Sequence, residues 1–210
     1  RRRPRQPAGN RTYLPFPGGV LLHTGLPNPG ISRVIIKYQL AWAESPLPVI
    51  AHLLAEHPAT LSEMVRKLEG LENVQAVSIG IAPGCDPTHL EAFTEAALGE
   101  LPVILSLSPE QLPLLDTVIA LQPSAVHLAP PRGILRDERG EWVTGRLYGP
   151  ATTPILLKTL ISLKDADLDV IASGGIYTRE QAQAFLDAGA SAVSLGLALW
   201  GVNLENLFLA

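Results

Sequence analysis

Asp169-Val-Ile-Ala-Ser-Gly-Gly-Ile176 and Ala190-Ser-Ala-Val-Ser-Leu-Gly-Leu-Ala198 are the two stretches that decide the fold of this 210-residue chain. Each is a short apolar run that leads into glycine, and a polar segment starting at Thr178 separates them. Thr178 and Gln181 have the spacing of a capping box, in which a threonine and a glutamine three residues later satisfy the first amides of a helix. The order strand, glycine turn, capped helix, strand predicts a βα unit of a parallel sheet.

The same order of apolar run, turn and amphipathic segment repeats from residue 48 onward. The apolar runs have few polar residues on either face, as expected of strands buried on both sides. Whole (β/α)8 barrels are typically about 250 residues long, so we expect an α/β fold of the TIM-barrel type that is incomplete, with about six parallel strands present. These predicted strands are Pro48–Leu53, Ala76–Ile81, Val103–Leu107, Ala125–Leu128, Asp169–Ala172 and Ala192–Leu195.

The helical segments and the chain ends complete this expectation of one domain over residues 1–210. Thr60 to Glu63 and Ser108 to Gln111 repeat the capping-box spacing and predict two further helix starts. Residues 1–40 are predicted to be loop-rich, with a short hairpin around Gly18 and Gly19 and a helix near Ile31–Leu40. The start at Arg1 predicts a processed or truncated chain, and open strand edges in an incomplete barrel predict a homo-oligomer.

Composition narrows the class of protein. The net charge is −4 and the basic cluster lies within the first five residues, so we expect no nucleic-acid partner. Cys85 is the only cysteine and no run of about 18 apolar residues is present, which predicts a cytoplasmic protein without a membrane partner. No histidine, cysteine or acidic residues have the spacing of a metal site, so none is predicted.

The glycines at the ends of the last two predicted strands indicate a phosphate site. In barrels of this type the loops after the seventh and eighth strands bind phosphate through backbone N–H groups and a helix start. Gly174, Gly175 and Gly196 are the residues expected to bind a phosphate-bearing small molecule. The alternative is that Gly174 and Gly175 only make a tight turn and that Gly196 only relieves crowding inside the barrel.

The segment Gly145-Arg-Leu-Tyr-Gly-Pro-Ala-Thr-Thr-Pro-Ile-Leu-Leu-Lys158, together with the two glycine-ended strands, resembles the FMN-binding half of dihydroorotate dehydrogenase. Pro102 to Pro109, Thr24 to Gly30 and the residues from Arg3 to Asn10 are weaker similarities to the same family. The resemblance implies an FMN-dependent oxidoreductase of pyrimidine biosynthesis, with a phosphate-binding region over residues 145–200. It assigns the backbone of Gly149, Gly174, Gly175, Gly196 and Leu197 to the flavin phosphate.

The same resemblance places different residues at the family's reactive positions. The strand-end lysine corresponds to Ser106, and the base corresponds to Ala82. The asparagines that hold the substrate correspond to Leu22 and to the pair Val126-His127. A flavin dehydrogenase needs a base and a cation beside the flavin, so the identity of the catalytic residues is unknown.

Three functions therefore stay open: a dihydroorotate dehydrogenase-like FMN oxidoreductase, a non-catalytic relative or subunit that keeps the phosphate site, and a barrel lyase or isomerase acting on a phosphorylated substrate. His127 is a candidate acid or base, and His52, His23, His57 and Cys85 are weaker candidates against a purely structural role. The loop from Pro130 to Trp142 is either a lid carrying Arg132 or Arg136 to an anion or a solvated hairpin around Arg139.

Overall fold

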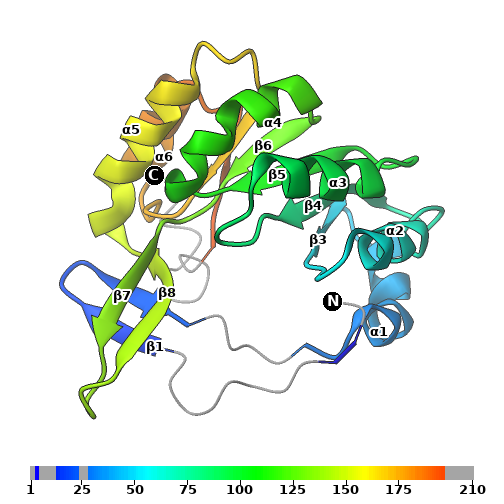
Figure 1. Ribbon diagram of the computed structural model, residues 1–210, viewed down its shortest axis with the longest axis horizontal. Coiled ribbons are helices and arrows are strands. Elements are labelled where there is room, and N and C mark those ends of the chain that lie inside the picture. Colours follow the sequence, from blue (N-terminus) through cyan, green and yellow to red (C-terminus); the bar gives the residue numbers. More distant parts are fainter. Residues whose placement is uncertain (1–2, 5–12, 24–27, 197–210) are drawn as a thin grey trace. The chain divides into compact units, whose positions relative to one another are not determined.

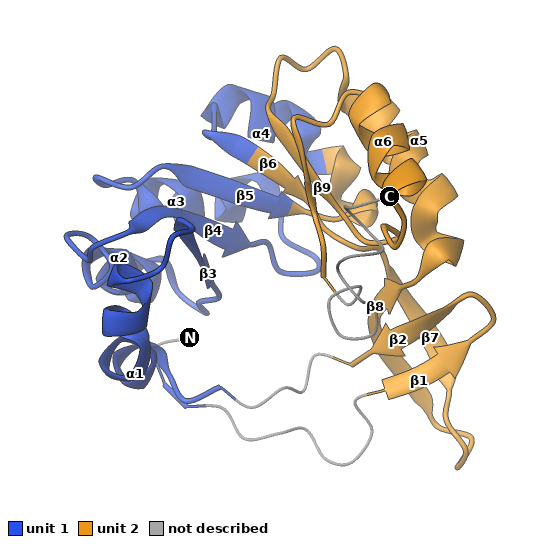
Figure 2. Ribbon diagram, turned by 180° about the vertical axis from the view of Figure 1, so that it is seen from behind, with its two compact units in different colours: residues 1–7, 26–106, 114–125 blue, residues 8–25, 107–113, 126–210 orange. Residues whose placement is uncertain are grey.

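The computed structural model describes residues 3–4, 13–23 and 28–196 of the chain. It divides into two compact units (Figure 2). Unit 1 contains residues 1–7, 26–106 and 114–125, and unit 2 contains residues 8–25, 107–113 and 126–210. Each unit is described by itself.

Unit 1 contains three parallel strands in the order β5-β4-β3 and four helices (Figure 1). Its elements are α1 (Ile31–Ala43), β3 (Val49–Leu53), α2 (Pro58–Arg66), β4 (Val74–Gly80), α3 (Pro87–Ala97), β5 (Val103–Leu107) and α4 (Leu115–Leu121). Leu61, Met64 and Leu90 on the helices are buried with Val77 and Leu105 on the strands. This apolar core stabilises unit 1, because each such side chain contributes roughly 1.5–3 kcal/mol when it is fully buried.

Unit 2 contains three parallel strands in the order β10-β9-β6 and a four-stranded antiparallel sheet in the order β1-β2-β8-β7. Its strands are β1 (Tyr13–Phe16), β2 (Gly19–Leu22), β6 (Ala125–Leu128), β7 (Arg132–Arg136), β8 (Trp142–Tyr148), β9 (Val170–Ser173) and β10 (Ala192–Ser194). Its helices are α5 (Thr153–Leu163), α6 (Arg179–Asp187) and the 3-10 helices η1 (Pro109–Leu114) and η2 (Pro150–Thr152). Leu128, Leu156, Leu160 and Phe185 are almost fully buried in this unit.

The six predicted parallel strands are confirmed as β3, β4, β5, β6, β9 and β10, and the fold is an incomplete α/β barrel of the TIM type. The expected hairpin around Gly18 and the helix after Ile31 are also present. The segment after Pro130 forms the β7–β8 hairpin with a turn from Asp137 to Gly140, which is the second of the two expectations for it. The joining of β8 to β2 in an antiparallel sheet was not predicted.

The predicted helix starts have different outcomes. Thr178 is confirmed as the cap of α6, because it accepts from the Gln181 amide while Gln181 accepts from the Thr178 amide. At the expected helix start of Ser108, Gln111 Oε1 accepts from the amide and the hydroxyl of Ser108 just before η1. The prediction for Thr60 was wrong: α2 begins two residues earlier at Pro58, whose ring favours the first helical position.

Candidate functional site

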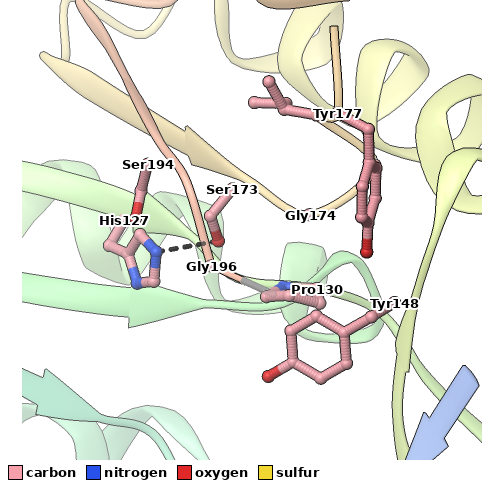
Figure 3. A pocket seen from close by; sticks show the side chains of 10 residues that line it. His127, Pro130, Tyr148, Ser173, Gly174, Tyr177, Ser194 and Gly196 are labelled. Atoms are coloured by element: carbon pink, nitrogen blue, oxygen red, sulfur yellow. Dashed lines mark hydrogen bonds between the residues drawn. The ribbon is translucent and has the colours of Figure 1, made fainter. Parts of the chain in front are cut away.

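A pocket of about 170 Å³ lies in unit 2 at the ends of β6, β8, β9 and β10 (Figure 3). It brings together Gly174, Gly175 and Gly196, the three glycines that the sequence assigned to a phosphate. Ligand pockets for whole small molecules usually enclose about 300–1,000 Å³, so this one has room for a headgroup. The remaining lining residues are His127, Pro130, Tyr148, Ser173, Ile176, Tyr177 and Ser194.

Gly174 and Gly175 form the turn that follows β9. Their φ angles are +87° and +68°, which side chains rarely tolerate. A Cβ at Gly175 would lie 2.7 Å from Thr153 Oγ1, and one at Gly174 would lie 3.1 Å from Leu156 Cδ1. Thr153 Oγ1 donates to the Gly175 carbonyl at 2.9 Å and fixes this turn against the start of α5. Glycine is therefore required here both by backbone conformation and by close packing.

The other predicted phosphate residues lie in different surroundings. A Cβ at Gly196 would meet no atom of the described residues within 4 Å, and Gly196 lines the pocket. Gly149, with φ +129°, is outside the pocket lining, and its Cα faces the turn at Gly18 and Gly19 so closely that a Cβ would collide with the Gly18 carbonyl. Leu197 lies outside the described residues.

The start of α6 contributes less to the pocket than the sequence suggested. Gln181 Oε1 accepts from the amides of Tyr177 at 2.7 Å and Thr178 at 3.0 Å. The capping box thus already uses the amides of Tyr177, Thr178 and Gln181. Gly174 and Gly175 of the preceding turn line the pocket.

His127 on β6 and Ser173 on β9 form the polar wall of the pocket. His127 Nε2 lies 2.9 Å from Ser173 Oγ, and Ser173 Oγ donates to the Leu128 carbonyl at 3.1 Å. A hydroxyl has one hydrogen, so Ser173 must accept from His127, and neutral His127 carries its proton on Nε2. The half-buried histidine is therefore held in one tautomer and one orientation.

Tyr148 and Tyr177 form the opposite wall (Figure 3). Burial raises the pKa of Tyr148, and burial together with the neighbouring phenols of Tyr148 and Tyr13 raises the pKa of Tyr177. Both phenols therefore remain neutral hydrogen-bond donors at physiological pH. Arg146 Nη1 donates to the Pro130 carbonyl at 2.8 Å, and burial lowers the pKa of this guanidinium.

The weaker candidates lie outside this pocket. His52 Nδ1 pairs with Ser78 Oγ at 3.2 Å in unit 1, and His23 Nδ1 pairs with the Thr144 carbonyl at 2.7 Å in unit 2. Burial and the Asp86 carboxylate raise the pKa of Cys85, which makes its thiol a poorer nucleophile. His57 precedes α2 as its N-cap.

In the described part of the chain, no three histidine, cysteine or acidic residues are placed to hold a metal ion. None of the described helices is long and apolar enough to cross a membrane. Ser106 is buried near the end of β5, and Ala82 follows β4.

No protein-family model matches the chain. Among curated proteins it is 28% identical to the catalytic subunit of dihydroorotate dehydrogenase B (NAD(+)) from Bacillus cereus, over 87% of this chain and 66% of that protein. The Bacillus thuringiensis protein of the same name gives the same identity and coverage. The chain is a homologue of the dihydroorotate dehydrogenases. It spans just under two thirds of the length of these curated relatives.

Solved structures of dihydroorotate dehydrogenase from Eimeria tenella share the fold of this homologue. The ligand-free structure gives a TM-score of 0.69 at 16% identity, over 95% of this chain and 71% of the other. The complex with ferulenol gives a TM-score of 0.67 at 16% identity, over 93% and 68% of the two chains. At this identity the likeness shows the barrel fold alone.

Sequence reasoning assigned no role in the pocket to Pro130, Tyr148, Ser173, Ile176, Tyr177 or Ser194. Tyr148 and Tyr177 are the largest of these residues. Each directly adjoins a recognised motif, because Tyr148 precedes Gly149 and Tyr177 follows Gly174-Gly-Ile176. An aromatic residue on a strand or before a helix is usually part of a core, so the residue type alone gave no signal. Their positions beside the glycines were the only available hint.

Proposed function

We propose that this chain binds the phosphate end of flavin mononucleotide in the unit 2 pocket and does not oxidise dihydroorotate. The observation that carries the first part is the meeting of Gly174, Gly175 and Gly196 in one small pocket. Two of these glycines have left-handed φ angles, and a Cβ at the third would meet no atom of the described residues within 4 Å. Backbone amides of such glycine turns are a common cradle for phosphate oxygens.

The pocket fits a phosphate better than it fits a whole flavin. Its volume of about 170 Å³ is below the usual range for whole small ligands, so the remainder of the cofactor would extend out of it. A Cβ at Gly175 would intrude on the start of α5, whereas one at Gly196 would meet no atom of the described residues. When bound, the flavin would supply hydride acceptance, and Gly174, Gly175 and Gly196 would hold its phosphate.

The second part rests on residue types. Dihydroorotate oxidation of the family's kind needs a base for a carbon-bound proton and a cation for the reduced flavin. We assign these positions to Ala82 and Ser106, and neither side chain can remove a proton or hold a positive charge. The substrate-holding asparagine positions fall on Leu22 and on His127 of the pair Val126-His127, and neither residue has a side-chain amide.

One observation favours a second candidate, a flavin oxidoreductase with another substrate. His127 lines the pocket, and a histidine is a suitable acid or base near neutral pH. In that case His127 would exchange the substrate proton while Ser173 keeps its ring oriented. Replacement of His127 by Gln would then stop turnover and leave flavin binding intact.

The first experiment is to purify the protein with added FMN, record its absorbance from 300 to 550 nm and assay it with dihydroorotate. We expect a flavin band that stays with the protein and no formation of orotate above a flavin-only control. Absence of the band after saturation with FMN would refute the binding proposal. Formation of orotate at an enzymatic rate would refute the second part.

A cytoplasmic location and a homo-oligomeric state also belong to this proposal. The single cysteine supports a reducing compartment, and β3 and β10 lie at the two edges of the described parallel strands. Sedimentation velocity would test the second expectation, which a stable monomer at all concentrations would contradict.

A further inference from the structure

No lysine or arginine stands among the described residues that line the pocket. The lining residues that the structure describes carry five polar side chains: His127, Tyr148, Ser173, Tyr177 and Ser194. The two serines and the two tyrosines among them are neutral at physiological pH. A phosphate placed here must therefore obtain hydrogen bonds mainly from uncharged donors.

Two of these side chains already have defined partners. Ser173 accepts from His127 and donates to the Leu128 carbonyl, so its single hydrogen is used. Figure 3 shows this pair on one side of Gly174, with the rings of Tyr148 and Tyr177 on the other side and Pro130 beside them. Both phenol rings thus line the same pocket as the glycine turn.

We propose that Tyr148 and Tyr177 are phosphate-binding residues whose hydroxyl groups donate to the phosphate oxygens. This inference rests on the proposed flavin-phosphate function and deepens it by naming the side chains of the grip. Tyr177 follows the glycine turn directly, and its amide is fixed by Gln181, so its ring leaves the backbone at a set point beside the pocket. Tyr148 ends β8, where pairing with Val20 fixes its backbone.

Arg146 supplies a positive charge from outside the described pocket lining. Its guanidinium donates to the carbonyl of Pro130, which lines the pocket, and it interacts electrostatically with Tyr148. The charge thus favours an anion and polarises the phenol while the guanidinium stays outside the lining. A hydrogen bond to a charged group contributes more than one to a neutral group, so the tyrosine hydroxyls provide a measurable part of the affinity.

The test is a fluorescence titration of FMN and of riboflavin, with inorganic phosphate as competitor, for the wild type, Tyr148→Phe, Tyr177→Phe and Tyr38→Phe. Phenylalanine keeps the ring and removes only the hydroxyl, and circular dichroism checks the fold. Tyr38 lies on α1 in unit 1 and is the matched control. We expect each pocket variant to bind FMN about tenfold more weakly, which corresponds to about 1.4 kcal/mol. Riboflavin affinity and the control should stay unchanged.

Each other outcome has one meaning. If the wild type binds FMN and inorganic phosphate competes, but the phenylalanine variants bind as tightly, the tyrosine inference is wrong and the proposed function stands. If the variants lose FMN and riboflavin affinity equally, the phenols contact another part of the flavin and the inference is also wrong. If the wild type binds neither FMN nor inorganic phosphate, the proposed function fails and the inference falls with it.

Discussion

The two units of this chain carry similar parallel strands but differ at the strand ends. Each has a histidine paired with a serine on a neighbouring strand: His52 with Ser78 in unit 1 and His127 with Ser173 in unit 2. In unit 2 the strand that carries Ser173 runs into two left-handed glycines, and these glycines line a pocket with the histidine. Because both units have the polar pair, the glycine turn is the feature that distinguishes the candidate site in unit 2.

This comparison has a chemical reason. A phosphate cradle made of backbone amides depends on where glycine stands and not on side-chain chemistry. Acid–base and substrate-holding positions depend on particular side chains, and a single substitution removes their function. Under the proposed function, unit 2 keeps the glycines, for which backbone suffices, whereas the positions in unit 1 that we assign to the base and the lysine hold Ala82 and Ser106.

The largest expected effect comes from Gly175→Ala. Alanine at position 175 would need a backbone φ of +68°, which is unfavourable for a residue with a side chain. Its Cβ would also lie 2.7 Å from Thr153 Oγ1, so the turn must move. We expect at least a tenfold loss of FMN affinity in a fluorescence titration and a loss of about 1–3 kcal/mol in unfolding free energy. Gly70→Ala in unit 1 is the matched control, because Gly70 has φ +75° and no atom within 4 Å of a new Cβ. Equal FMN affinity in both variants would show that the glycine turn takes no part in FMN binding.

The second effect separates the two histidine–serine pairs. Ser173→Ala removes a buried hydroxyl that serves both His127 and the Leu128 carbonyl, so we expect a loss of about 1–3 kcal/mol in urea unfolding. Ser78→Ala removes a hydroxyl that pairs with the exposed His52 at 3.2 Å, and its loss should be smaller. A larger loss of unfolding free energy for Ser78→Ala than for Ser173→Ala would contradict these roles of the two hydroxyl groups.

A third comparison uses the two threonines with capping-box spacing. Thr178→Ala removes the cap of α6 and should cost about 1 kcal/mol of unfolding free energy. Thr60→Ala lies inside α2, where alanine has the higher helix propensity, so we expect no loss. Chemical denaturation of both variants would measure this difference, and equal losses would show that Thr60 also caps a helix.

The smallest expected effect is a pH dependence. The pKa of Tyr148 is raised in the folded state, so the folded protein binds this proton more tightly than the unfolded chain. The resulting stability is fully present below about pH 10, the ordinary phenol pKa, and is lost as the pH rises through the higher folded value. Tyr148→Phe should therefore have a flatter decline of unfolding free energy between pH 9 and 11 than the wild type. An identical decline in both proteins would contradict the burial of this phenol.

The sequence predicted the strands well because strands buried on both faces leave uninterrupted apolar runs. It also predicted the cap at Thr178, whose polar pattern directly precedes an amphipathic segment. It failed at Thr60, since Pro58 starts the helix earlier. The pairing of β8 with β2 joins residues more than 120 positions apart, and no local pattern encodes such a contact.

The candidate site was predictable only in part for a related reason. Glycines in left-handed turns are recognisable in a sequence, so Gly174 and Gly175 were identified. The surroundings of Gly149 were not predictable, because its close contact with Gly18 arises from the distant β1–β2 hairpin. Tyr148 and Tyr177 come together only through folding, and their wall of the pocket became visible only in the structure.

The most direct test of the account is a pair of titrations of the wild-type protein, one with FMN and one with riboflavin, which differs by lacking the phosphate. A phosphate grip predicts that FMN binds at least tenfold more tightly and that inorganic phosphate weakens FMN binding but not riboflavin binding. Equal affinities for the two flavins, or no binding of FMN, would contradict the claim that unit 2 holds a phosphate.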